Sequence, residues 1–111
     1  MSVWTRIACA EDVPMLEGRS VHVAGHQIAV FRLPGGWAAT DARCPHKGGP
    51  LQDGIVADSC VTCPLHQRRF DLRSGAQIGG PDTIEVHEIE ERDGALWVRL
   101  AEGRADLEDA A

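Results

Sequence analysis

The sequence predicts an all-β protein, a small antiparallel β-sandwich interrupted by an insertion that carries metal ligands. Twelve glycines and six prolines divide the chain at short intervals, which favours many turns between short strands over long helices. The segments between these turns are rich in β-branched residues, and several alternate apolar with polar positions. A chain of 111 residues has room for one domain with its own core.

The first half of the chain is expected to form four strands. Loops that contain glycine or proline separate them, and the β-branched residues on either side of residues 24–26 predict a hairpin. The turn at Pro34-Gly35-Gly36 leads into the fourth strand. The expected strands are residues 2–8, 19–23, 27–33 and 37–41.

The second half is expected to add a hairpin and three further strands, and the tail at 102–111 is expected to be helical or frayed. Residues 83–91 alternate Ile84, Val86 and Ile89 with polar side chains, as a half-buried strand does. The closing strand places Leu96, Val98 and Leu100 on one face. The hairpin strands are 53–57 and 59–62, and the others are 68–72, 83–91 and 95–100.

Charge and hydropathy limit the partners. The formal net charge of -6 argues against nucleic acid, because phosphate binding depends on clustered lysine and arginine. The N-terminal residues do not form a secretion signal, and no apolar run approaches the roughly 20 residues of a spanning helix. We therefore expect a soluble, cytoplasmic protein without a membrane partner, in which cysteines stay reduced unless they bind metal.

Residues 44–66, "CPHKGGPLQDGIVADSCVTCPLH", hold three of the four cysteines and two of the five histidines. Cys44 and His46 form one pair, and Cys63 and His66 form a second. The predicted hairpin between the pairs would carry both loops back to the same place, since antiparallel pairing brings strand ends together.

Several chemistries could use these four residues. A structural zinc site usually opens with C-x₂₋₄-C, which the C-x-H spacing does not match. A disulfide framework would need an oxidising compartment. A Cys63–His66 nucleophile pair would need a pocket and an orienting third group. Two irons bridged by sulfide fit better, because thiolates can hold one iron while imidazoles hold the other.

The stretch from Trp37 to Pro81 resembles the Rieske 2Fe-2S proteins through "CPHKGGPL", "DG", "CPLH", "FDL", "SG" and "GGP". The resemblance implies a Rieske-like sandwich and one 2Fe-2S cluster, bound as cofactor by Cys44, His46, Cys63 and His66. It also implies a single domain over residues 1–111. Its parts would be a base sandwich at about 1–41 and 76–101, a cluster-binding subdomain at about 42–75, and a tail at 102–111.

Several positions differ from the high-potential members of this family. The disulfide cysteines of the respiratory members correspond to Gly49 and Leu65, and their serine and tyrosine hydrogen-bond donors correspond to Arg68 and Phe70. Without these donors the reduced cluster is less stabilised, so the resemblance implies a low reduction potential. The residue after the second histidine is usually glycine or small and polar, but here it is Gln67. Residues 79–82 are similar to the family's third loop, which closes over the cluster.

The segments "GHQIAVFR", "CPHKGGPLQDGIV", "VTCPLH" and "FDLRSG" are most similar to the small subunit of assimilatory NAD(P)H nitrite reductase. That resemblance implies a flavin- and sirohaem-containing large subunit as redox partner. The alternative is the Rieske ferredoxin of a ring-hydroxylating dioxygenase, which works with a ferredoxin reductase and a terminal oxygenase. A domain that keeps the fold without the cluster is disfavoured by the four ligands. In either case we expect an electron-transfer component rather than a catalyst on its own.

The remaining cysteines and histidines receive no role in the site. Cys9 and Cys60 are expected to be small buried side chains. The three remaining histidines are expected to lie on the surfaces of strands, and Arg68 and Arg69 to form a solvated face. These histidines are His22, His26 and His87.

Overall fold

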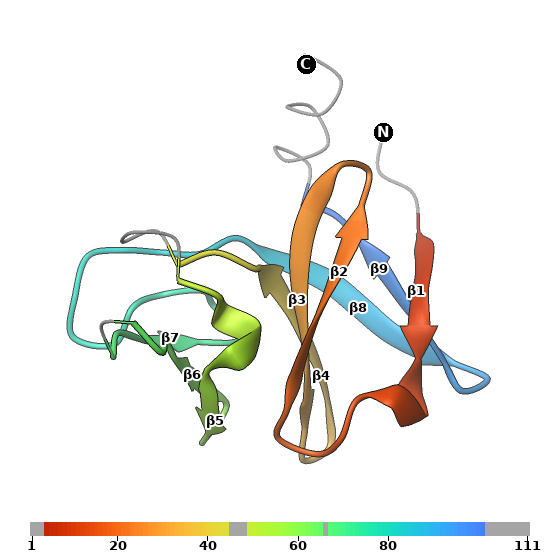
Figure 1. Ribbon diagram of the computed structural model, residues 1–111, viewed down its shortest axis with the longest axis horizontal. Helices are drawn as coiled ribbons and strands as arrows, with labels where there is room; N and C mark the ends of the chain where they lie inside the picture. Colours follow the sequence, from red (N-terminus) through yellow and green to blue (C-terminus); the bar gives the residue numbers. More distant parts are fainter. Residues whose placement is uncertain (1–3, 45–48, 66, 102–111) are drawn as a thin grey trace.

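The protein is built from two antiparallel β-sheets (Figure 1). A computed structural model describes residues 4–44, 49–65 and 67–101. The larger sheet has six strands in the order β1-β9-β8-β4-β3-β2, and the smaller has three in the order β5-β6-β7.

The prediction of an all-β fold is confirmed, and in the described residues the only helical segments are two short 3₁₀ turns. No helix among these residues is long and apolar enough to cross a membrane. The elements are β1 (Thr5–Cys9), η1 (Ala10–Asp12), β2 (Gly18–Val23), β3 (His26–Leu33), β4 (Gly36–Asp41), η2 (Leu51–Asp53), β5 (Ile55–Ala57), β6 (Cys60–Thr62), β7 (Arg69–Asp71), β8 (Val86–Arg92) and β9 (Ala95–Arg99).

Three hairpins turn through two residues that both have positive φ, the geometry that matches the natural twist of paired strands. The turn between β2 and β3 uses Ala24 and Gly25, so β3 begins at His26, one residue earlier than expected. The turns between β5 and β6 and between β8 and β9 use the pairs Asp58–Ser59 and Asp93–Gly94. The predicted hairpin around residues 24–26 and the predicted hairpin between the two cysteine loops are therefore both present.

Strand β3 is buried on both faces, and its alternate side chains enter two different cores. Ile28 and Val30 point into the core of the large sheet, together with Leu96 and Val98 of β9. We call this the sandwich core. Ala29, Phe31 and Leu33 point the other way into an interface core between the two sheets. The interface core consists of Ala29, Phe31, Leu33, Ala38, Ala42, Cys44, Leu51, Val56, Val61, Cys63, Phe70, Leu72 and Ile84.

The small sheet lies beside the strands β2, β3 and β4, with η2 between them (Figure 1). A Cβ atom at Gly18 would lie 2.8 Å from both the Gln52 carbonyl oxygen and the Phe31 ring. Only glycine allows η2 to approach β2 and the fully buried Phe31 this closely.

Backbone hydrogen bonds hold the chain where it leaves β4. The Asp41 N–H donates to the Glu85 carbonyl at 3.0 Å, and the Ala42 N–H donates to the Gln27 carbonyl at 3.2 Å. The Ala42 carbonyl then accepts the Leu51 N–H at 2.8 Å. Both ends of the segment that follows are thus fixed to the large sheet.

The expectation that His87 lies on the surface is wrong. Its side chain is completely buried, and its Nε2 lies 3.0 Å from Asp41 Oδ1. Its Nδ1 accepts the Ala101 N–H at 3.0 Å, which assigns the ring proton to Nε2 and makes that nitrogen the donor to Asp41. The contact joins β8 to the end of β4 and to the chain after β9. The strand expected at residues 83–91 begins three residues later than expected, because β8 starts at Val86.

Replacing His87 by alanine should destabilise the protein by about 2–4 kcal/mol, because it leaves a cavity and deprives Asp41 and the Ala101 N–H of a buried partner. The measurement is urea unfolding of His87→Ala beside His22→Ala. His22 is exposed on β2, so its variant should unfold within about 0.5 kcal/mol of the parent protein. Equal midpoints for the two variants would contradict the structural role of His87.

Candidate metal centre

Two of the four predicted ligands lie on neighbouring loops and are buried. Cys44 follows β4 and is 2% exposed, and Cys63 follows β6 and is 0% exposed. Neither is joined in a disulfide, and both belong to the interface core. The sequence prediction that the small hairpin brings these loops together is confirmed for the two cysteines. His46 and His66 lie outside the described residues.

Gly49 joins the two loops. Its carbonyl accepts the Cys44 N–H at 2.8 Å, so it belongs to the turn that holds the first cysteine. A Cβ atom on Gly49 would lie 2.6 Å from Cys63 Sγ and 3.2 Å from Leu65 Cγ. The absence of a side chain therefore lets the first loop close directly over the sulfur of the second. Gly49 and Leu65, which correspond to the disulfide cysteines of the respiratory Rieske proteins, do face each other.

The second loop is held by a tight turn. The Cys63 N–H donates to the Arg68 carbonyl at 2.7 Å, and the Gln67 N–H donates to the Cys63 carbonyl at 3.0 Å. Gln67 has φ 58, in the left-handed region where residues other than glycine are strained by roughly 1 kcal/mol. This conformation explains why glycine suits the position after the second histidine.

The part of the predicted ligand set that the structure describes, Cys44 and Cys63, is chemically suited to an iron-sulfur cluster. Cys44 and Cys63 are not in a disulfide and lie among buried apolar side chains, so they provide soft sulfur ligands in a site that limits water access. Within the described ranges, no group of three or more His, Cys, Asp and Glu side chains could hold a metal ion. The assignment of Cys44 and Cys63 as ligands therefore stays a prediction.

The expectation of a buried side chain is confirmed for Cys60 and is wrong for Cys9. Cys60, on β6, is 8% exposed. Cys9, at the end of β1, is only half-buried, and its Sγ lies 3.6 Å from Arg6 Nη2. Phe70 is fully buried in the interface core and has no group that could donate a hydrogen bond to sulfur.

Arg68 and Arg69 differ from each other, although the sequence predicts one solvated face for both. Arg69 is exposed. The Arg68 side chain is 31% exposed, and its Nη1 lies 3.6 Å from Asp82 Oδ2. The sequence does not reveal this ion pair, because Asp82 lies on a separate loop that a hydrogen bond from the Ile78 N–H to the Arg69 carbonyl fastens to β7.

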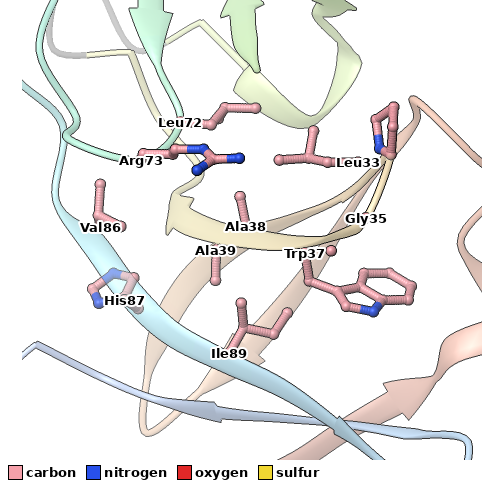
Figure 2. Close-up of a pocket in the computed structure, with 12 residues that line it drawn as sticks. Leu33, Gly35, Trp37, Ala38, Ala39, Leu72, Arg73, Val86, His87 and Ile89 are labelled. Atoms are coloured by element: carbon pink, nitrogen blue, oxygen red, sulfur yellow. The ribbon is translucent and has the colours of Figure 1, made fainter. Parts of the chain in front are cut away.

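A pocket of about 420 Å³ lies between β4, β8 and the turn after β7 (Figure 2). Leu33, Trp37, Leu72 and Arg73 are among its lining residues, and the buried ring of His87 reaches its edge. Neither Cys44 nor Cys63 lines it, and both ring nitrogens of His87 are already hydrogen-bonded. The pocket is therefore separate from the candidate metal centre.

Comparisons with known proteins identify the domain. The family model of the Rieske [2Fe-2S] domain matches residues 3–90. The anthranilate 1,2-dioxygenase ferredoxin subunit of Burkholderia cepacia is 39% identical over 93 residues, which cover 81% of this chain and 82% of the relative. The ferredoxin component of naphthalene 1,2-dioxygenase/salicylate 5-hydroxylase systems from a Ralstonia species is 35% identical over 83 residues, or 75% of this chain and 80% of the relative.

A solved structure described as an NADH-dependent nitrite reductase small subunit from Mycobacterium tuberculosis superposes with a TM-score of 0.85. Its sequence identity is 25%, and the match covers 91% of this chain and 97% of that protein. The fold therefore resembles this nitrite reductase subunit closely, whereas the two ferredoxins have the higher sequence identities.

Replacing Gly49 by alanine should reduce the amount of iron bound. The added methyl would collide with Cys63 Sγ, and overpacking of this kind costs about 1–3 kcal/mol. The measurement is iron and acid-labile sulfide per chain. Gly36→Ala is the matched control, because a Cβ at Gly36 meets nothing within 4 Å. Full iron content in Gly49→Ala would show that the contact does not constrain the centre.

Proposed function

The chain belongs to the Rieske [2Fe-2S] domain family, and we propose that this electron-transfer protein is the ferredoxin component of a ring-hydroxylating dioxygenase system. In that role it would accept single electrons from a flavin-containing reductase and pass them to a terminal oxygenase. The observation that carries the proposal is its 39% and 35% identity to two dioxygenase ferredoxins over most of both chains. We further propose a cytoplasmic location.

The second candidate is the small subunit of an NAD(P)H-dependent nitrite reductase. The similarity of "CPHKGGPLQDGIV" and "FDLRSG" to those subunits favours it, as does the TM-score of 0.85 with one of them. We place it second because the sequence identity of that solved structure, 25%, is lower than that of the ferredoxins.

We propose that Cys44 and Cys63 hold one iron and that His46 and His66 hold the other. The bound cluster supplies reversible one-electron chemistry. The cluster-binding subdomain would comprise about residues 42–75, on a base sandwich of about 1–41 and 76–101, with a tail at 102–111.

The protein's own residues set the environment of the centre. The buried Phe70 and Leu72 exclude water on the side of the cysteines. Leu65 and Ile78 are 54% and 47% exposed, and they give the partner an apolar surface beside the Cys63 loop. Because Phe70 donates no hydrogen bond, we propose a potential near the lower end of the Rieske range of about -150 to +300 mV, which a redox titration tests.

The ligand assignment predicts that Cys63→Ser loses the cluster while Cys60→Ser retains it. Both side chains are buried and only three positions apart, so the comparison separates ligation from loss of a buried thiol. Absorption and EPR spectra of the purified variants are the measurement. Cys44→Ser, His46→Ala and His66→Ala should behave like Cys63→Ser. A normal Rieske spectrum in any of these four variants would exclude that residue as a ligand.

The proposed function is tested by offering the reduced protein to both kinds of partner. We expect it to restore substrate oxidation to a ring-hydroxylating terminal oxygenase, when a ferredoxin reductase and NADH supply the electrons. We expect no stable complex with a sirohaem-containing subunit in gel filtration. Nitrite-dependent oxidation that requires the sirohaem subunit, without turnover of the oxygenase, would establish the second candidate instead.

A further inference from the structure

Arg68 is fixed beside the candidate metal centre by its backbone. Its carbonyl accepts the Cys63 N–H at 2.7 Å, and the next residue, Arg69, pairs with Thr62 across β6 and β7. Arg68 therefore cannot move away from the second cysteine without breaking the turn that holds Cys63.

The Arg68 side chain is unusual because its charge is partly withdrawn from water. It is 31% exposed, and its Nε atom is buried without a hydrogen-bond partner in the described structure. Leaving a buried donor unsatisfied costs about 1–3 kcal/mol. Among the residues that the structure describes, its ion pair is with Asp82, where Nη1 lies 3.6 Å from Oδ2.

Asp82 belongs to a loop that is rigid in its own right. The Gln77 N–H donates to the Asp82 carbonyl at 2.9 Å, and the Asp82 N–H donates to Gln77 Oε1 at 3.2 Å. The Gln77 side chain fills the inside of the loop, since a Cβ at Gly80 would lie 2.5 Å from it. The Ile78 N–H donates to the Arg69 carbonyl at 2.8 Å and fastens the loop to β7.

We propose that Arg68 positions this loop against the Cys63 loop and that its charge raises the reduction potential of the bound cluster, while Asp82 lowers it. The inference rests on the proposed function only in requiring a bound 2Fe-2S cluster, and it is independent of which partner protein the chain serves.

The sign of each effect follows from charge. Reduction adds one negative charge to the cluster, so a nearby cation stabilises the reduced form and a nearby anion destabilises it. Because Arg68 and Asp82 are both partly buried, salt screens them less than it screens exposed charges.

The test is a redox titration of four loaded variants followed by their EPR signal. Arg68→Gln should lower the midpoint and Asp82→Asn should raise it, whereas Arg68→Lys should stay near the parent protein. Arg69→Gln is the matched control and should shift the midpoint much less, because Arg69 is exposed. If only the loop's position mattered, Arg68→Gln and Asp82→Asn would break the same ion pair and shift the midpoint in the same direction.

Hydrogen exchange of the Gln77 and Asp82 amides gives a readout that does not depend on the potential. We expect both amides to exchange faster in Arg68→Gln and to be unchanged in Arg69→Gln.

The charge effect would be overturned by equal midpoint shifts in Arg68→Gln and Arg69→Gln. It would also be overturned if Arg68→Gln and Asp82→Asn shifted the midpoint in the same direction. Unchanged exchange in Arg68→Gln would overturn the positioning role. Neither measurement depends on electron exchange with an oxygenase or a sirohaem subunit. A failure of the proposed function would appear only in the partner assay, and a failure of this inference only in the midpoints or the amide exchange.

Discussion

The middle of strand β3 is buried on both faces, so its alternate side chains must satisfy two cores at once. Ile28 and Val30 pack into the sandwich core, and Phe31 packs against the small sheet. Complete burial of a phenylalanine side chain contributes about 1.5–3 kcal/mol, and here it is obtained only when the small sheet is docked. The position of the two cysteine loops is therefore linked to the folding of the large sheet.

Docking of the small sheet leaves the centre itself little freedom. Each cysteine has its N–H bonded to a carbonyl of its own loop, Gly49 for Cys44 and Arg68 for Cys63. Gly49 also contacts the sulfur of Cys63, so each loop limits the other. Ligands held in this way before the cofactor binds need little rearrangement, and a carrier of single electrons benefits because its ligands stay in place when its charge changes.

Local patterns predicted the hairpins and the approach of the two cysteine loops, whereas long-range burial was not predictable. The turn at Ala24-Gly25 and the hairpin between Cys44 and Cys63 are contained within short segments. The burial of His87 depends on Asp41, 46 residues away, and alternation along its own strand gives no sign of that partner. Arg68 was missed for the same reason, since its environment is set by Asp82.

Local and global charge act on the centre in different ways. The formal net charge is -6, and most carboxylates among the described residues are exposed. Salt screens exposed charges beyond about 8 Å at physiological ionic strength. Arg68 adjoins Cys63 and is partly buried, so its single charge counts for more than several distant carboxylates. It opposes the effect of Phe70, which withholds a hydrogen bond from sulfur. On the proposed assignment, the potential depends more on a few residues around Cys63 than on the acidity of the whole protein.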